Sequence, residues 1–156
     1  MLLVFSLACA SAYSQNSNNF INIVSNTSLN WNINTVTEIE NDQTINSAIT
    51  IRVKNRSSPS YRSVYVRCSS IIGPPGFTIP YIPLQLDHTS NNSPNESNLI
   101  TTPLTITTTN QRLFTHARHS SNSTYSFNYN LIHTATNWSF PPGTYNYTLT
   151  FTFVNP

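Results

Sequence analysis

Charged residues are scarce in this chain. They make up 8% of its 156 residues, and the net charge is only +2. Lys54 is the only lysine and the six arginines are scattered, so the sequence has no dense basic stripe of the kind that nucleic-acid binding requires. The low charge does not indicate disorder, because aromatic residues reach 12%. We therefore expect one folded domain with a real core and no nucleic-acid partner.

The sequence also lacks a hydrophobic run long enough to cross a bilayer, so we expect no transmembrane segment. Residues 2–7 form a short apolar run, and three alanines follow it between residues 8 and 12. This pattern is typical of the end of a secretory signal peptide, although the usual positive n-region is missing. We predict a signal peptide over residues 1–14 and a single mature domain over residues 15–156. Secretion would place that domain in the periplasm, on the cell surface or outside the cell.

Cysteine is rare as well. After the predicted cleavage only Cys68 remains, and one thiol cannot form an internal disulfide. Its neighbours offer only Arg67 as an activating group, so we expect Cys68 to be a small buried side chain in a strand. Cys9 leaves a second interpretation of the N-terminus open, in which Cys9 is lipidated. Ser6 then stands where a lipobox has an aliphatic residue.

Acidic groups are too few and too scattered to indicate catalysis. Among the five carboxylates, Glu38 and Glu40 lie two residues apart, a spacing that seldom lets two carboxyl groups flank a cleft. The sequence has no Gly-x-Ser-x-Gly motif around a nucleophile. We predict that the protein is not an enzyme and has no cofactor.

Histidine spacing gives little support for a metal site. His116 and His119 point to opposite faces of a strand, and zinc needs a third or fourth ligand that the nearby sequence does not supply. We predict no bound metal, and we interpret these two residues as solvated loop histidines. Loops are also the default expectation for His88 and His133.

Apolar and polar residues alternate strictly in several stretches of the sequence, and residues 143–154 show this pattern best. Tyr145, Tyr147, Leu149, Phe151 and Phe153 share one parity, and threonine or asparagine fills the other. Successive side chains of a strand point to opposite faces, so this segment predicts a long antiparallel strand with one apolar face and one hydroxyl-rich face.

The same alternation recurs at spacings near ten residues, with no convincing helix. It predicts an all-β fold, an antiparallel immunoglobulin-like β-sandwich of about eight strands. We expect residues 45–54 to pair with 63–69 as a hairpin, and the last two long strands to pair across 134–142. Two prolines make 79–86 an edge strand or an extended crossing, and 89–98 is expected to be an exposed loop. The side chains expected to face one core are Ile51, Val53, Val64, Val66, Tyr125, Phe127, Tyr145, Leu149 and Phe151.

The end of the chain resembles a known type of ending. Residues 140–145 read Phe-Pro-Pro-Gly-Thr-Tyr and precede an alternating strand. They resemble the ending of pilin-like domains of the spore-coat-protein-U type, which serve archaic chaperone–usher pili of Gram-negative bacteria. Residues 46–53, 65–70 and 82–86 are similar to successive stretches of the same domains. Those pilins often carry a disulfide, which Cys68 alone cannot supply.

The resemblance implies a secreted, non-enzymatic surface or fimbrial protein. Its partners would be other subunits in self-assembly, or machinery of the chaperone and usher type. Strand addition along an exposed edge is one means of such assembly. The natural donor is the mature N-terminus, residues 15–24, with an interface made by Phe20, Ile21, Ile23 and Val24. Alternatively this segment completes its own sheet, which would make the domain self-sufficient and favour a binding module or a monomeric surface protein. Tyr65 is a further interface candidate. Its neighbours Val64 and Val66 are expected to face the core, so Tyr65 is expected to point outward.

A glycan-binding module is the alternative function. Aromatic side chains give sugars a flat apolar face beside a polar tip. Trp31 shares the parity of Leu29 and Ile33 and is expected in the core. Tyr81 and Trp138 lie outside the alternating strands, so they are the first candidates for ligand-binding aromatics.

Overall fold

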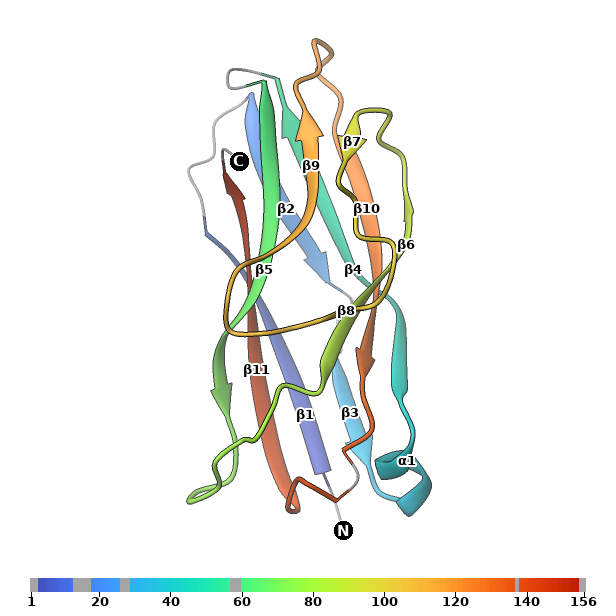
Figure 1. Ribbon diagram of the computed structural model, residues 1–156, viewed down its shortest axis with the longest axis vertical. Helices are drawn as coiled ribbons and strands as arrows, with labels where there is room; N and C mark the ends of the chain where they lie inside the picture. Colours follow the sequence, from blue (N-terminus) through green and yellow to red (C-terminus); the bar gives the residue numbers. More distant parts are fainter. Residues whose placement is uncertain (1–2, 13–17, 26–28, 57–59, 137, 155–156) are drawn as a thin grey trace.

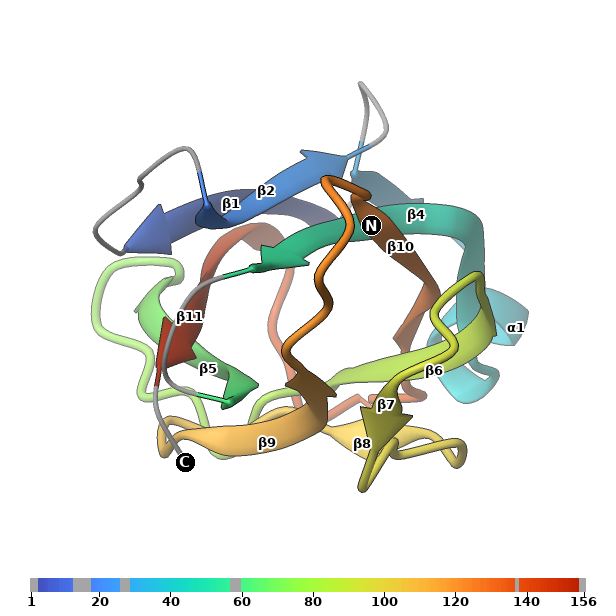
Figure 2. The same ribbon diagram turned by 90° about the horizontal axis from the view of Figure 1, so that it is seen from above.

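The computed structural model describes residues 3–12, 18–25, 29–56, 60–136 and 138–154. Strands make up most of the described residues, and the only helix among them is five residues long. Two sheets pack face to face as a sandwich, which confirms the predicted fold class. Figure 2 shows the sheets enclosing the core, with β1 (Leu3–Ala12) and β2 (Asn19–Ser25) side by side where the sheets approach each other.

Sheet A has six strands in the order β3-β1-β11-β5-β9-β7 (Figure 1). Its members besides β1 are β3 (Asn30–Ile33), β5 (Tyr61–Ile72), β7 (Glu96–Ser97), β9 (Gln111–Ala117) and β11 (Gly143–Val154). Sheet B has five strands in the order β2-β4-β10-β6-β8. Its members besides β2 are β4 (Gln43–Asn55), β6 (Leu84–Asn91), β8 (Leu104–Thr105) and β10 (Tyr125–His133).

The predicted core is confirmed. All nine side chains expected there are at most 9% exposed, and β10 and β11 alternate between buried and partly or fully exposed positions as their parity predicts. Phe114 of β9 stacks on Phe127 of β10, with ring centroids 3.8 Å apart, and so joins the two sheets. Trp31 and Cys68 are buried as predicted, at 6% and 2% exposure.

Both predicted hairpins are wrong. β4 belongs to sheet B and pairs with β2 and β10, whereas β5 belongs to sheet A and pairs with β11 and β9. Likewise β10 pairs with β4 and β6 rather than with β11. Each connection therefore crosses from one sheet to the other. Alternation says which face of a strand is apolar, but both sheets present such a face to the same core.

A short helix that we did not predict spans Val36–Glu40 and is labelled α1. It begins with a capping box: Thr35 Oγ1 accepts from the backbone N–H of Glu38, and Glu38 Oε2 accepts from the N–H of Thr35 at 2.9 Å. Backbone hydrogen bonds from Asn34 and Thr35 lower the pKa of Glu38. The helix buries Ile39 against the core, which is why this connection is ordered locally.

The expected loop at 89–98 is also more structured than predicted. β6 continues to Asn91, and Glu96 and Ser97 form β7, which pairs with His116 and Thr115 of β9. The prediction of an edge strand or an extended crossing over residues 79–86 holds only for 79–83, which form no strand. Residues 84–86 belong to β6, where Leu86 pairs with β10 on one side and with β8 on the other.

Three histidines predicted to lie in loops belong to strands: His88 lies in β6, where it is half-buried, and the other two are fully buried. His116 of β9 is 0% exposed and His133 of β10 is 1% exposed. His116 packs against Tyr125 at 5.1 Å between ring centroids, and His133 packs against Trp31 at 5.4 Å. Burial lowers the pKa of each imidazole to about 4, so both are neutral at pH 7.

Gly143 starts β11 where a side chain would not fit. Its φ is 157°, and a Cβ added there would overlap Cγ of Pro74. We expect Gly143→Ala to lower the free energy of unfolding by about 1–3 kcal/mol, because the added methyl group forces the Pro74 turn away from β11. Thr144→Ala, at an exposed neighbour, should change it by less than about 0.5 kcal/mol. Thermal melts of the two variants make the comparison, and equal losses would contradict this contact.

Candidate functional site

The first candidate site is the place of β1 in sheet A, which we name the strand slot. β3 forms one wall and residues 143–152 of β11 form the other (Figure 1). β1 runs parallel to β11 over ten register positions, from Leu3 opposite Gly143 to Ala12 opposite Thr152. All other strand pairs in the described residues are antiparallel. The segment in the slot lies wholly within the predicted signal peptide.

The β11 wall of the slot has a second strand partner, whereas β1 is the only strand that β3 pairs with among the described residues. β11 pairs along its other edge with β5, from Asn146 opposite Ile72 to Val154 opposite Ser63. β3 contacts the opposite sheet through the Trp31–His133 ring pair. Tyr145 donates its hydroxyl to the carbonyl of Pro141 at 2.8 Å, and burial raises the pKa of both Tyr145 and Tyr147. The Tyr145 and Tyr147 side chains are therefore fixed on the core face of β11, beside the strand slot.

The predicted interface residues of the N-terminal segment lie in β2, which pairs with β4 over its whole length. Ile21 is 0% exposed, Phe20 and Ile23 are half-buried, and Val24 is 39% exposed. This segment therefore completes sheet B in the described structure, the second of the two arrangements left open by the sequence. Residues 15–17 lie outside the described residues.

Tyr65 of β5 is half-buried on sheet A, where its register partners are Thr152 of β11 and Arg112 of β9. Its buried neighbours Val64 and Val66 face the core, as the alternation predicted. Tyr65 is on the opposite face of the sheet from the core, but it is not adjacent to the strand slot, because β11 separates β5 from β1.

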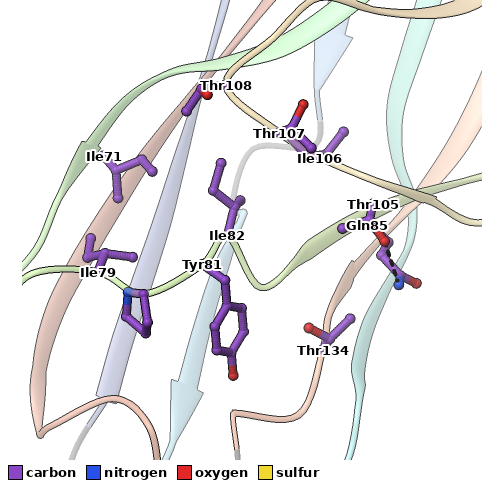
Figure 3. A pocket seen from close by; sticks show the side chains of 11 residues that line it. Ile71, Ile79, Tyr81, Ile82, Gln85, Thr105, Ile106, Thr107, Thr108 and Thr134 are labelled. Carbon is purple, nitrogen blue, oxygen red and sulfur yellow. Dashed lines mark hydrogen bonds between the residues drawn. The ribbon is translucent and has the colours of Figure 1, made fainter.

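The second candidate site is a cavity of about 640 Å³, which we name the side pocket. It opens where the crossing at residues 79–82 and the segment at residues 105–108 pass between the two sheets. Figure 3 shows Ile71 and Ile79 on one side, Gln85 and Thr105 on the other, and Tyr81 with Thr134 at one end. Volumes of this size are usual for small-ligand pockets.

Tyr81 is 41% exposed and lines the side pocket, whereas Trp138 does not line it. Trp138 is 52% exposed and has a φ of 65°, an unusual conformation for a bulky residue. The two aromatic candidates are therefore not in one binding surface. They are linked only indirectly, since Tyr81 Oη donates to the carbonyl of Thr136 at 3.3 Å.

Among the described residues, no three His, Cys, Asp or Glu side chains are placed to hold a metal ion. Glu38 caps α1, and Glu40 at the end of that helix is exposed. Burial raises the pKa of the Cys68 thiol, which makes it a poor nucleophile. Within the described ranges, no helix is long and apolar enough to span a membrane.

Sequence reasoning missed most of the side pocket. Gln85, Thr105 and Thr134 come from three segments that are distant in sequence, and each is an ordinary surface residue in its own segment. Only Tyr81 carried a signal, as an aromatic residue outside the alternating strands.

No family model, curated protein or solved structure matches this chain. The resemblance to pilin-like domains therefore rests on the short motifs given above and stays a prediction.

Proposed function

We propose that the protein is a secreted structural or surface protein, a pilin-like subunit that assembles through strand pairing. The observation that carries this proposal is the overlap between β1 and the predicted signal peptide. If the leader is removed, sheet A loses the strand that joins β3 to β11, and the strand slot opens between them. A strand from a second molecule would then restore the sheet.

Two physical features favour strand addition at the slot. First, the edge of β11 would present unpaired N–H and C=O groups along ten register positions, a ready template for another strand. Second, the apolar side chains of β11 next to the opening, including Leu149 and Phe151, are 0% exposed in the described structure. Exposing such a surface is unfavourable, at roughly 25 cal/mol per Å² of apolar area. An incoming strand would pair the open N–H and C=O groups of β11 and would also cover its apolar side chains.

The incoming strand has two proposed sources, another copy of the chain or assembly machinery of the chaperone and usher type. Within this chain the proposed donor is the segment at residues 15–24. Donation would require β2 to leave β4 and to withdraw Ile21 from the core. A copy that donates this segment must first break its own β2–β4 pairing. We therefore expect strand exchange between two copies to be slower than binding of a free peptide.

Removal of the leader tests the proposal. A chain comprising residues 15–156 is expected to form ladder-like oligomers on size-exclusion chromatography. Its monomer should melt about 6–12 °C below the full chain, as a loss of about 3 kcal/mol produces in a domain of this size. A synthetic peptide of residues 1–14 should restore both the monomer and the melting temperature. The same peptide with Leu7→Pro is the control, because proline removes a backbone donor within β1.

A further truncation identifies the donor. If a chain comprising residues 25–156 folds and the oligomers vanish, residues 15–24 are the donated strand. If this chain fails to fold, β2 is an intrinsic strand. A chain of residues 15–156 that stays monomeric at high concentration, melts like the full chain and ignores the peptide would contradict the proposal.

Glycan binding is the alternative function. The side pocket favours it, since it is a concave site outside the strand slot.

A further inference from the structure

The side pocket has a neutral lining. Its eleven residues include no Lys, Arg, Asp, Glu or His. The one weakly acidic group is the Tyr81 hydroxyl, which donates to the Thr136 carbonyl. A charged ligand would lose hydration on entering the pocket without gaining a partner of opposite charge. The lining therefore selects an uncharged ligand.

Hydrogen-bonding groups form part of the pocket lining, and some are held in place. Gln85 Nε2 donates to Thr105 Oγ1 at 3.2 Å, the pair joined by a dashed line in Figure 3. The Gln85 amide keeps a second N–H and a carbonyl oxygen that this bond does not use. Thr107 is fixed through its backbone, which accepts from Cys68 N at 2.8 Å and donates to Gln111 Oε1 at 2.9 Å. The hydroxyls of Thr105, Thr108 and Thr134 add groups that both donate and accept.

Apolar side chains form the remainder of the lining. Ile71, Ile79 and Ile82 are partly buried and pack against the core, and Ile106 is 1% exposed. A ligand for this pocket must therefore present carbon surface and hydroxyl groups together. A purely apolar ligand would displace water from the threonine hydroxyls and from Gln85. It would offer no hydrogen bonds in place of those that these groups make to water.

Tyr81 provides an aromatic ring that is already oriented. Its hydroxyl is tied to Thr136, and its ring meets Phe140 edge to face at 5.3 Å and 87°. Phe140 is 1% exposed, so it is a fixed support. A ring that is held at two points and still 41% exposed loses little conformational entropy when a ligand stacks on it.

We propose that the side pocket binds an uncharged sugar ring. The C–H face of the sugar contacts Tyr81 and the isoleucines, and its hydroxyls exchange hydrogen bonds with Gln85, Thr105 and Thr134. A sugar hydroxyl both donates and accepts, which matches the amide and hydroxyl groups of this lining. The site is independent of the strand slot, so it holds whether or not the protein assembles through strands.

Saturation-transfer NMR on the purified protein tests the site. The probes are the methyl glycosides of glucose, galactose, mannose and N-acetylglucosamine, with N-acetylneuraminic acid as a charged comparator and cyclohexanol as an apolar ring. We expect saturable binding of at least one methyl glycoside and weaker binding of both comparators. Tyr81→Ala should weaken that binding about tenfold, the usual order of one lost aromatic contact. Tyr61→Ala is the matched control, because Tyr61 is also exposed, at 53%, but does not line the pocket.

Two further variants keep the test decisive if Tyr81→Ala disturbs the fold. Tyr81→Phe retains the ring and should bind within about threefold of the wild type, and Gln85→Ala should bind less tightly than Tyr61→Ala. The proposal is overturned if no methyl glycoside binds the folded protein. Binding that survives both Tyr81→Ala and Gln85→Ala, or that cyclohexanol or N-acetylneuraminic acid matches, would also overturn it.

Discussion

Phe151→Ala is expected to lower the free energy of unfolding by about 3–5 kcal/mol, as removal of a fully buried aromatic ring usually does. Phe151 is 0% exposed and lies in the C-terminal half of β11, where it is opposite Val66 of β5. The loss combines the transfer of the ring to water with the cavity left in the core. Chemical denaturation followed by circular dichroism measures it.

Thr150→Ala is the matched control for this prediction. Thr150 lies one residue away on the outer face, where its hydroxyl donates to Ser69 Oγ at 2.7 Å in an exposed setting. We expect a loss of under about 1 kcal/mol, because an exposed hydrogen bond exchanges readily with water. Similar losses at Phe151 and Thr150 would refute the division of β11 into a core face and a wet face.

Acid is expected to destabilise the fold through its two buried histidines. His116 and His133 have pKa values of about 4 in the folded protein, because burial disfavours the charged imidazole, against about 6.5 in an unfolded chain. Between these values the unfolded chain binds more protons than the folded one, so stability falls as the pH drops from 6.5 to 4. Each histidine contributes a loss of about 3 kcal/mol over that window, and neither contributes further below it.

The charges around His116 modify this loss without reversing it. Glu96 raises the pKa of His116 and His119 lowers it, and both effects are smaller than that of burial. Asp42 likewise raises the pKa of His133. His116→Phe keeps a ring against Tyr125 and Phe127 but cannot titrate. Denaturation at several pH values should show about half the wild-type loss between pH 6.5 and 4, and an unchanged profile would contradict the assignment.

Strand parity was the strongest signal in the sequence. Every side chain of β10 and β11 that parity placed in the core is buried. Parity succeeds here because the two-residue period of a strand is a local property of the backbone. It also placed Trp31 and Cys68 correctly inside. Such features need no knowledge of which strands are neighbours.

Polar residues misled the same reasoning where burial depends on distant segments. His116 resembles a loop histidine in its own sequence, yet β7 and β5 flank it and Tyr125 packs on its ring. The segment around Glu38 looked like an irregular connection, although its capping box and the burial of Ile39 make one helical turn stable. For His116 a tertiary contact outweighed the local composition, whereas the Thr35–Glu38 capping box is a local motif that the sequence interpretation overlooked.

By itself, the sequence determined that this protein is all-β and which face of each long strand is apolar, whereas for residues 79–86 it left an edge strand and an extended crossing open. Only the tertiary structure decided which strands are neighbours, that residues 3–12 lie between β3 and β11, and that Tyr81, Gln85, Thr105 and Thr134 border one pocket. The physical reason is the range of the interactions. Side-chain alternation follows from the geometry of one strand, whereas pairing depends on which of several equivalent apolar faces close together around a shared core.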